Sequence, residues 1–126
     1  MHILIIEDNT ANLFLLKRIL RVINCEISHF SRAEQALTAL STIQPDLILT
    51  DIQLAGQLTG LDFIQEVRQS GNTLPIIAMT AYAMDGERQK CLDAGCDEYI
   101  AKPFNVVQLT ELFNQYLTDG TTNVFV

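Results

Sequence analysis

Residues 45–54 read PDLILTDIQL, and this stretch decides the fold. The run Leu47-Ile48-Leu49 is apolar without alternation, which is typical of a strand buried on both faces of a parallel sheet. It ends in Thr50 and Asp51, so a carboxylate stands where the buried strand reaches the edge of the sheet. The stretch therefore predicts a parallel sheet and a functional acid at its edge.

Strand-like runs on either side of this stretch alternate with segments of helical period. The predicted strands cover residues 2–6, 26–30, 47–50, 75–79 and 98–101, and the predicted helices lie near residues 13–23, 33–40, 61–69, 84–94 and 106–117. This alternation predicts one α/β domain, a five-stranded parallel sheet with helices on both faces. The second strand alternates in polarity, as expected of an edge strand.

Short motifs mark where the predicted helices begin and end. Ser31 followed by Glu34 is the pattern of a capping box at the start of the second helix. Gly71 and Gly95 stand where the third and fourth helices should stop. We expect the domain to cover residues 1–117, with residues 118–126 as a tail that is either a frayed end or the start of a linker.

The composition fits one acidic domain in a reducing compartment. The 126 residues are 48% hydrophobic, enough for one core, and the formal net charge of −7 argues against nucleic acid or an anionic membrane as a direct partner. No apolar run is long enough to span a bilayer. Cys25, Cys91 and Cys96 are an odd number and follow no cleavable leader, which predicts buried thiols in a cytoplasmic protein.

Polar residues suited to one chemistry follow four of the five predicted strands. The carboxyl ends of parallel strands share one edge of the sheet, and ligands bind there. If the strand order is 2-1-3-4-5, the first and third strands are neighbours and their acids meet. The edge would then gather Glu7 and Asp8, Asp51, Thr80 and Ala81, and Lys102 and Pro103.

Three carboxylates in one pocket would repel one another and raise each other's pKa unless a cation compensated them. Lys102 neutralises only one of them. The remaining charge predicts a divalent ion, and ligands that are all oxygen favour Mg²⁺. Asp8 would bind the metal directly, and Glu7 would bind it directly or through water.

A magnesium ion in such a site would bring in a phosphate group, so the pocket suits phosphoryl transfer. Asp51 would be the nucleophile and form an acyl phosphate. Lys102 would supply a point charge and Thr80 a hydroxyl donor, while the small side chain of Ala81 leaves room for the incoming group.

Each of these residues also has an ordinary structural explanation. In chain order, they would be helix caps at Asp8 or Asn9, a solvated loop acid at Asp51, a local backbone contact at Thr80, a half-buried aromatic at Tyr99 and a surface lysine at Lys102. The functional interpretation is preferred because four of the five strands end in the residue types that one mechanism requires.

Four segments resemble a known family. They read LIIEDN at residues 4–9, DLILTDIQL at 46–54, AMTAY at 78–82 and AGCDEYIAKPF at 94–104. In this order and spacing they resemble the response-regulator receiver domain of two-component signalling, over residues 1–117. The resemblance implies a flavodoxin-like (βα)₅ fold and a phosphoacceptor switch rather than an enzyme, with a histidine kinase or histidine phosphotransfer protein as the phosphodonor.

The resemblance also implies roles for individual residues. Mg²⁺, for which Mn²⁺ is a substitute, would be held by Glu7, Asp8, Asp51 and the main-chain carbonyl of Gln53. Thr80 and Lys102 would contact the phosphoryl oxygens, and the Lys102–Pro103 bond would be cis. Access to the phosphoryl group would depend on Gln53, Ala81 and Tyr82.

The same resemblance implies how a signal would leave the domain. Thr80 would move toward the phosphoryl group and Tyr99 would rotate inward behind it. The surface that changes would be residues 84–94, 98–101 and 106–117, and a downstream protein partner would bind there.

One segment departs from the family pattern. After Asp51 the family has a proline four residues on and a glycine eight residues on, whereas this chain has Ala55 in the first place and Gly60 one residue late. We therefore expect the loop at residues 54–60 to be longer by one residue.

Three other functions are compared with these motifs. A flavin carrier on the same architecture needs a Ser/Thr/Gly-rich phosphate loop after the first strand, but residues 9–12 lack glycine and the acids would repel the phosphate. An aspartyl-nucleophile phosphatase places its nucleophile on the first strand with a second acid two residues later, where this chain has Thr10. A receiver-shaped interaction module that takes no phosphate is disfavoured because the set of acids, Thr80 and Lys102 is complete.

Overall fold

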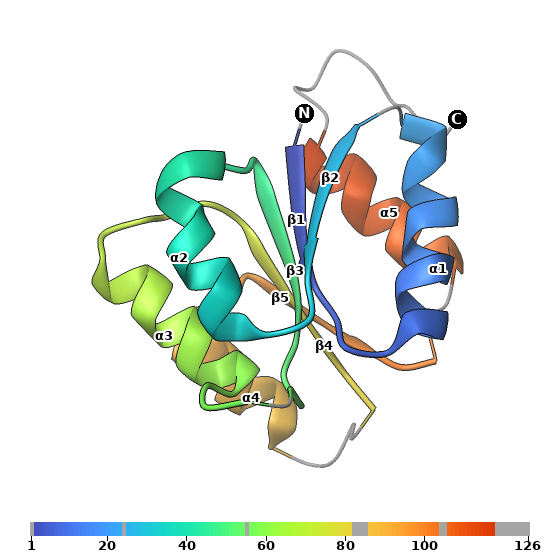
Figure 1. Cartoon of the computed structure of the whole chain (residues 1–126). Helices are drawn as coiled ribbons and strands as arrows, with labels where there is room; N and C mark the ends of the chain where they lie inside the picture. The colour runs from blue at the N-terminus through green and yellow to red at the C-terminus, as the bar shows by residue number, and fades with distance from the viewer. Residues whose placement is uncertain (1, 24, 55, 82–85, 104–105, 118–126) are drawn as a thin grey trace.

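The computed structural model describes residues 2–23, 25–54, 56–81, 86–103 and 106–117, in which strands and helices alternate (Figure 1). In chain order the elements are β1 (His2–Ile6), α1 (Thr10–Leu20), the 3₁₀ turn η1 (Arg21–Ile23), β2 (Glu26–Phe30), α2 (Ala33–Ile43), β3 (Leu47–Asp51), α3 (Gly60–Gln69), β4 (Ile76–Thr80), α4 (Glu87–Ala94), β5 (Glu98–Ala101) and α5 (Val106–Leu117). The predicted alternation is confirmed.

The strands form one parallel sheet in the order β2-β1-β3-β4-β5, as predicted. Ile6 pairs with Thr50 at the end of β1, and Thr80 pairs with Ala101 at the end of β4. The carboxyl ends of the central strands therefore lie together, at the lower edge of the sheet in Figure 1. This edge is where the candidate functional residues follow their strands.

The predicted bounds of two strands, β3 and β4, were wrong by one residue. β3 continues through Asp51, which pairs with Met79, instead of ending at residue 50. β4 covers Ile76–Thr80 instead of residues 75–79, because Pro75 has no backbone N–H to donate to a strand ladder. Both differences place a functional side chain inside the last position of a strand and so fix its direction.

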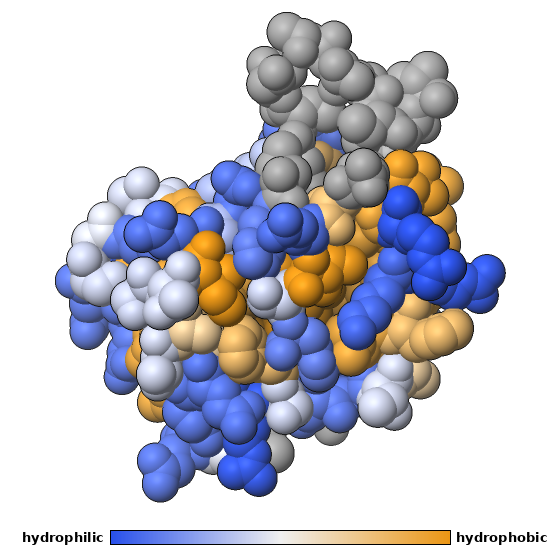
Figure 2. All heavy atoms as spheres, turned by 45° about the horizontal axis from the view of Figure 1, so that its top comes forward, coloured by the Kyte–Doolittle hydropathy of each residue, from blue (hydrophilic) through white to orange (hydrophobic). Residues whose placement is uncertain are grey.

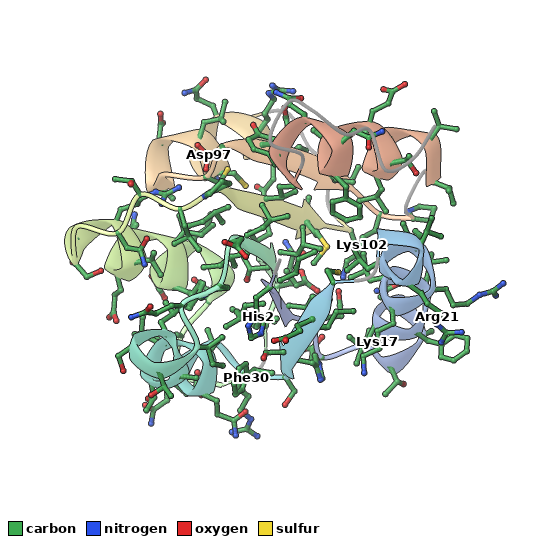
Figure 3. All side chains as sticks on the ribbon, turned by 90° about the horizontal axis from the view of Figure 1, so that it is seen from above. His2, Lys17, Arg21, Phe30, Asp97 and Lys102 are labelled. Atoms are coloured by element: carbon green, nitrogen blue, oxygen red, sulfur yellow. The ribbon has the colours of Figure 1, made fainter. Side chains whose placement is uncertain are left out.

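Helices cover both faces of the sheet, with α1 and α5 on one side and α2, α3 and α4 on the other (Figures 1 and 3). Successive side chains of a strand point to opposite faces. Thus Ile3 and Ile5 of β1 join the core under α1 and α5, whereas Leu4 and Ile6 join the core under α2, α3 and α4. All four side chains are fully buried.

Side chains cap two of the helices that follow the strand ends. Asn9 caps α1 by accepting a hydrogen bond from the main-chain N–H of Asn12, so the structural explanation proposed for Asn9 is confirmed. Thr59 and Asp62 form a capping box at the start of α3. Gly95 ends α4 in the position predicted for it.

The capping box predicted for α2 was wrong. The residue before this helix is Arg32, and it makes no side-chain cap. The Glu34 carboxylate instead reaches the loop after β3, where it accepts a hydrogen bond from the main-chain N–H of Gln57. A sequence pattern cannot show that a distant loop offers this carboxylate better-placed donors.

The three cysteines are free thiols, and two of them are buried as predicted. Cys91 and Cys96 are buried free cysteines, and Cys25 is half-buried. Burial raises the pKa of each thiol, that of Cys96 to about 12.

Among the described residues, no helix combines the length and apolar character that crossing a membrane requires. The predicted helix start at Met84 and the tail at residues 118–126 lie outside the described residues.

Candidate functional site

Three acidic side chains meet at the carboxyl edge of the sheet. Glu7 and Asp8 directly follow β1, and Asp51 is the last residue of the neighbouring strand β3. One oxygen from each carboxylate lies within 4.8 Å of the others. Glu7 and Asp51 are buried, whereas Asp8 is exposed. The acids predicted to converge therefore do so, with one of them open to solvent.

The backbone and side chain of Glu7 are held by the neighbouring strand and by the start of α1. The main-chain N–H of Glu7 donates to the carbonyl of Phe30 at 3.1 Å, and Nε2 of His29 donates to the carbonyl of Glu7 at 2.8 Å. The main-chain N–H of Asn9 donates to Oε1 of Glu7 at 3.1 Å. Sequence analysis did not assign His29 to the site, because its contact depends on how β2 pairs with β1.

Lys102 joins two of the acids, although it lies far from them in the sequence. Its Nζ donates to Oε2 of Glu7 at 2.7 Å and to Oδ2 of Asp51 at 2.6 Å. Only 10% of the Lys102 side chain is exposed. The explanation of Lys102 as a surface lysine is therefore wrong. The Lys102–Pro103 peptide bond is cis, as predicted.

The charges in this site shift the pKa of both partners. Burial alone would lower the pKa of Lys102, but its hydrogen bonds to Asp51 and Glu7 outweigh burial and raise it. Burial raises the pKa of Glu7, and the bond from Lys102 offsets this only in part. At neutral pH the ammonium group is therefore charged and shared between two carboxylates.

The ligand atoms present fit a hard divalent cation. With Lys102 charged, the three carboxylates keep a formal charge of −2, which a divalent ion would balance. All three side chains offer oxygen, the donor that Mg²⁺ and Ca²⁺ prefer. Within the described part of the chain, these three acids form the cluster that could hold a metal.

Gln53 links the acid of β3 to the end of β4. Its main-chain N–H donates to Oδ1 of Asp51 at 3.0 Å. Its side-chain carbonyl Oε1 accepts a hydrogen bond of 2.9 Å from the hydroxyl of Thr80, which is fully buried. The Thr80 hydroxyl therefore contacts a side chain of the site.

The sequence model described as the response regulator receiver domain matches residues 3–114 of the chain. The chain belongs to this family. Receivers are the phosphoaccepting switches of two-component signalling rather than enzymes with turnover, and histidine kinases are their partners.

Two curated receivers show the contexts in which such sequences occur. The polar-differentiation response regulator DivK of Brucella anthropi is 33% identical over 120 residues, which cover 94% of this receiver and 97% of DivK. The sensor histidine kinase GacS of Pseudomonas protegens is 33% identical over 116 residues, which cover 88% of this receiver but 12% of GacS. Similar receivers therefore form nearly a whole regulator or a small part of a large kinase.

Solved structures share the fold of this receiver. The receiver domain of the sensor histidine kinase PA1611 from Pseudomonas aeruginosa, solved with a magnesium ion coordinated in its active-site cleft, is 33% identical with a TM-score of 0.82, over 92% of this chain and 96% of that one. A two-component response regulator from Clostridium difficile is 27% identical with a TM-score of 0.86, over 97% and 99% of the two chains.

Three further residues, Ala81, Tyr82 and Tyr99, were predicted to take part in phosphoryl access or switching. Ala81 follows Thr80 and is exposed. Tyr99 is half-buried and packs against the core under α2, α3 and α4, and its hydroxyl is buried without a hydrogen-bond partner among the described residues. Burial also raises the pKa of Tyr99. Tyr82 lies outside the described residues.

Proposed function

We propose that this receiver is a cytoplasmic protein whose Asp51 accepts a phosphoryl group from a phosphohistidine on a histidine kinase or histidine phosphotransfer protein, and that residues 1–117 suffice for this step. The observation that carries the proposal is the meeting of three carboxylates within 4.8 Å, two of them bonded to Lys102. Glu7, Asp8, Asp51 and the Gln53 carbonyl would hold Mg²⁺, or Mn²⁺ in its place. When bound, the metal would screen the negative charge of the phosphoryl oxygens.

Lys102 is placed to stabilise the negative charge that develops during phosphoryl transfer. Its ammonium group already touches Oδ2 of Asp51 at 2.6 Å, so a phosphoryl group on that carboxylate would lie within its reach. Its bond to Glu7 keeps the side chain aimed at the site. A fixed donor that needs no rearrangement stabilises developing charge better than solvent does.

The switch would begin with competition for one hydroxyl group. The Thr80 hydroxyl donates a hydrogen bond to the Gln53 side chain. A phosphoryl oxygen on Asp51 would offer this hydroxyl a charged acceptor in place of the Gln53 carbonyl. Charge-assisted hydrogen bonds are stronger than neutral ones, so Thr80 would leave Gln53. Tyr99, whose buried hydroxyl has no partner among the described residues, would then repack behind Thr80.

Exposed apolar side chains support two docking surfaces. Val106 and Val107, in the first turn of α5, are 53% and 66% exposed, and they support a downstream partner on α4, β5 and α5. Phe14 of α1 is 64% exposed, and the exposed Lys17 follows it by three residues and so lies on the same face of the helix. Lys17 and Arg21, the first residue of η1, both point outward in Figure 3. This face of α1 would contact the phosphodonor, and Figure 2 shows hydrophobic surface beside strongly hydrophilic side chains.

Labelling with a small-molecule phosphodonor tests the proposal directly. In the presence of Mg²⁺ we expect intact-mass spectrometry to show one added phosphoryl group per chain, because one nucleophile is available. Chelation of Mg²⁺ with EDTA should prevent the label, and restored Mg²⁺ should return it. Continued hydrolysis of the donor far beyond one equivalent would indicate a phosphatase instead. No label at saturating Mg²⁺ would leave an inert interaction module.

A further inference from the structure

The side chain of Glu34 crosses from α2 to the loop at residues 54–60, which follows β3. Its Oε1 accepts a hydrogen bond from the main-chain N–H of Gln57 at 3.3 Å. Its other oxygen, Oε2, is buried without a hydrogen-bond partner among the described residues. The carboxylate of this half-buried residue thus points toward the loop. This contact joins two segments that are 23 residues apart.

The loop is shaped to receive an anion at this point. Gly56 has a φ of +111°, and a Cβ there would overlap Oε1 of Glu34, so the close approach requires glycine. The main-chain amides of Glu34 itself, of Gln57 and of Leu58 lower the pKa of the Glu34 carboxyl group. Successive main-chain N–H groups beside a left-handed residue form a concavity that binds anions. Here a carboxylate of the same chain fills it.

Both ends of the loop are attached to the phosphoryl site. At its start, Gln53 bonds through its main chain to Asp51 and through its side chain to Thr80. At its end, the N–H of Gly60 donates to the carbonyl of Ile52 at 3.3 Å, and a Cβ at Gly60 would overlap the carbonyl oxygen of Asp51. The loop therefore begins and ends beside the end of the strand that carries the nucleophile, and Glu34 holds its middle to α2.

We propose that Glu34 is a positioning residue for the phosphoryl site, which holds the loop at residues 54–60 in the conformation that presents Gln53 to the metal and to Thr80. The inference rests on the proposed function. A loop that is longer by one residue has more conformations to lose, so a fixed point at its centre compensates for the added length. Glu34 would act on metal affinity and phosphoryl lifetime through the loop, without contacting the reacting atoms.

The test compares Glu34→Ala and Glu34→Gln with the control Glu66→Gln, a change at an exposed acid on α3. Calorimetric titration with Mg²⁺ should show binding about 5- to 10-fold weaker in Glu34→Ala, near the lower end of the effect of removing groups that orient metal ligands. Glu34→Gln keeps an acceptor oxygen and should be intermediate, and the control should match the wild type. The decay rate of the phosphoryl label should change in the same order.

A second variant breaks the same contact from the loop. Gly56→Ala would force its Cβ against Oε1 of Glu34, so this variant should weaken Mg²⁺ binding. Adding Glu34→Ala to Gly56→Ala should weaken Mg²⁺ binding little further, because two changes that act through one shared contact are not additive. Equal Mg²⁺ affinity in the wild type and Glu34→Ala, or additive effects in the double variant, would overturn the inference. A wild type that binds no Mg²⁺ would instead overturn the proposed function, and the inference with it.

Discussion

Asp51→Asn is expected to abolish phosphorylation of the receiver by a small-molecule phosphodonor. The amide has no anionic oxygen to attack phosphorus, and it removes one of the three charges that would hold Mg²⁺. The fold should survive, because the amide oxygen can still accept a hydrogen bond from one of the two donors, Lys102 or the main-chain N–H of Gln53, which contact different oxygens of Asp51 in the wild type. Intact-mass spectrometry at saturating Mg²⁺ should show no phosphorylated species, where the wild type shows one.

Asp93→Asn is the matched control for this experiment. Asp93 is an exposed acid on α4 that bonds to Gln89, so the same chemical change is made away from the sheet edge. We expect normal labelling of this variant. Persistent label in folded Asp51→Asn would mean that another residue is the acceptor and would contradict the proposal.

Lys102→Met is expected to destabilise the receiver strongly in the absence of divalent cations. It leaves two carboxylates, Glu7 and Asp51, buried without the ammonium group that both contact. Removing one partner from a buried ionic group costs about 3 kcal/mol or more of unfolding free energy. Urea unfolding at neutral pH should measure this loss, and Lys90→Met, a change at an exposed lysine of α4, should leave the unfolding free energy nearly unchanged.

Acid and Mg²⁺ should each relieve the defect of Lys102→Met. The pKa of Glu7 is raised in the folded wild type, first by burial, and it should rise further without Lys102. Because the folded state then holds its proton more tightly than the unfolded state, the loss is complete at neutral pH and shrinks as the pH falls toward the raised pKa. Mg²⁺ at about 100 times its Kd would return about 2.7 kcal/mol. Equal unfolding free energies of the variant and wild type at neutral pH without Mg²⁺ would contradict this account.

The residues of the site were largely predictable because topology alone brings them together. Once the sheet is parallel and its order is 2-1-3-4-5, the residues after β1 and β3 must be neighbours. Asp51 ends β3 and Lys102 follows β5, the two strands that lie on either side of β4, and the long lysine side chain reaches across that distance. Periodicity and chain order, together with the strand order 2-1-3-4-5 that the family resemblance implies, therefore sufficed to identify Glu7, Asp8, Asp51 and Lys102 as one group.

The side-chain partners around these residues were not predictable. Glu34 has the spacing of a helix cap, yet its carboxylate bonds to a loop 23 residues later. His29 reads as a polar residue of an edge strand, yet it donates to the carbonyl of Glu7. The hydrogen bond between Gln53 and Thr80 depends on the rotamers of one residue just after β3 and one at the end of β4. Such contacts depend on the tertiary structure, so the helix and strand propensities of the local sequence do not predict them.

The position of the phosphoryl group in the labelled chain tests the central claim most directly. Wild-type receiver would be phosphorylated with a small-molecule donor and Mg²⁺, cleaved, and sequenced by tandem mass spectrometry under conditions that preserve acyl phosphates. We predict that the phosphoryl group is found on Asp51. Its presence on any other residue, including the neighbouring acids Glu7 and Asp8, would contradict the account.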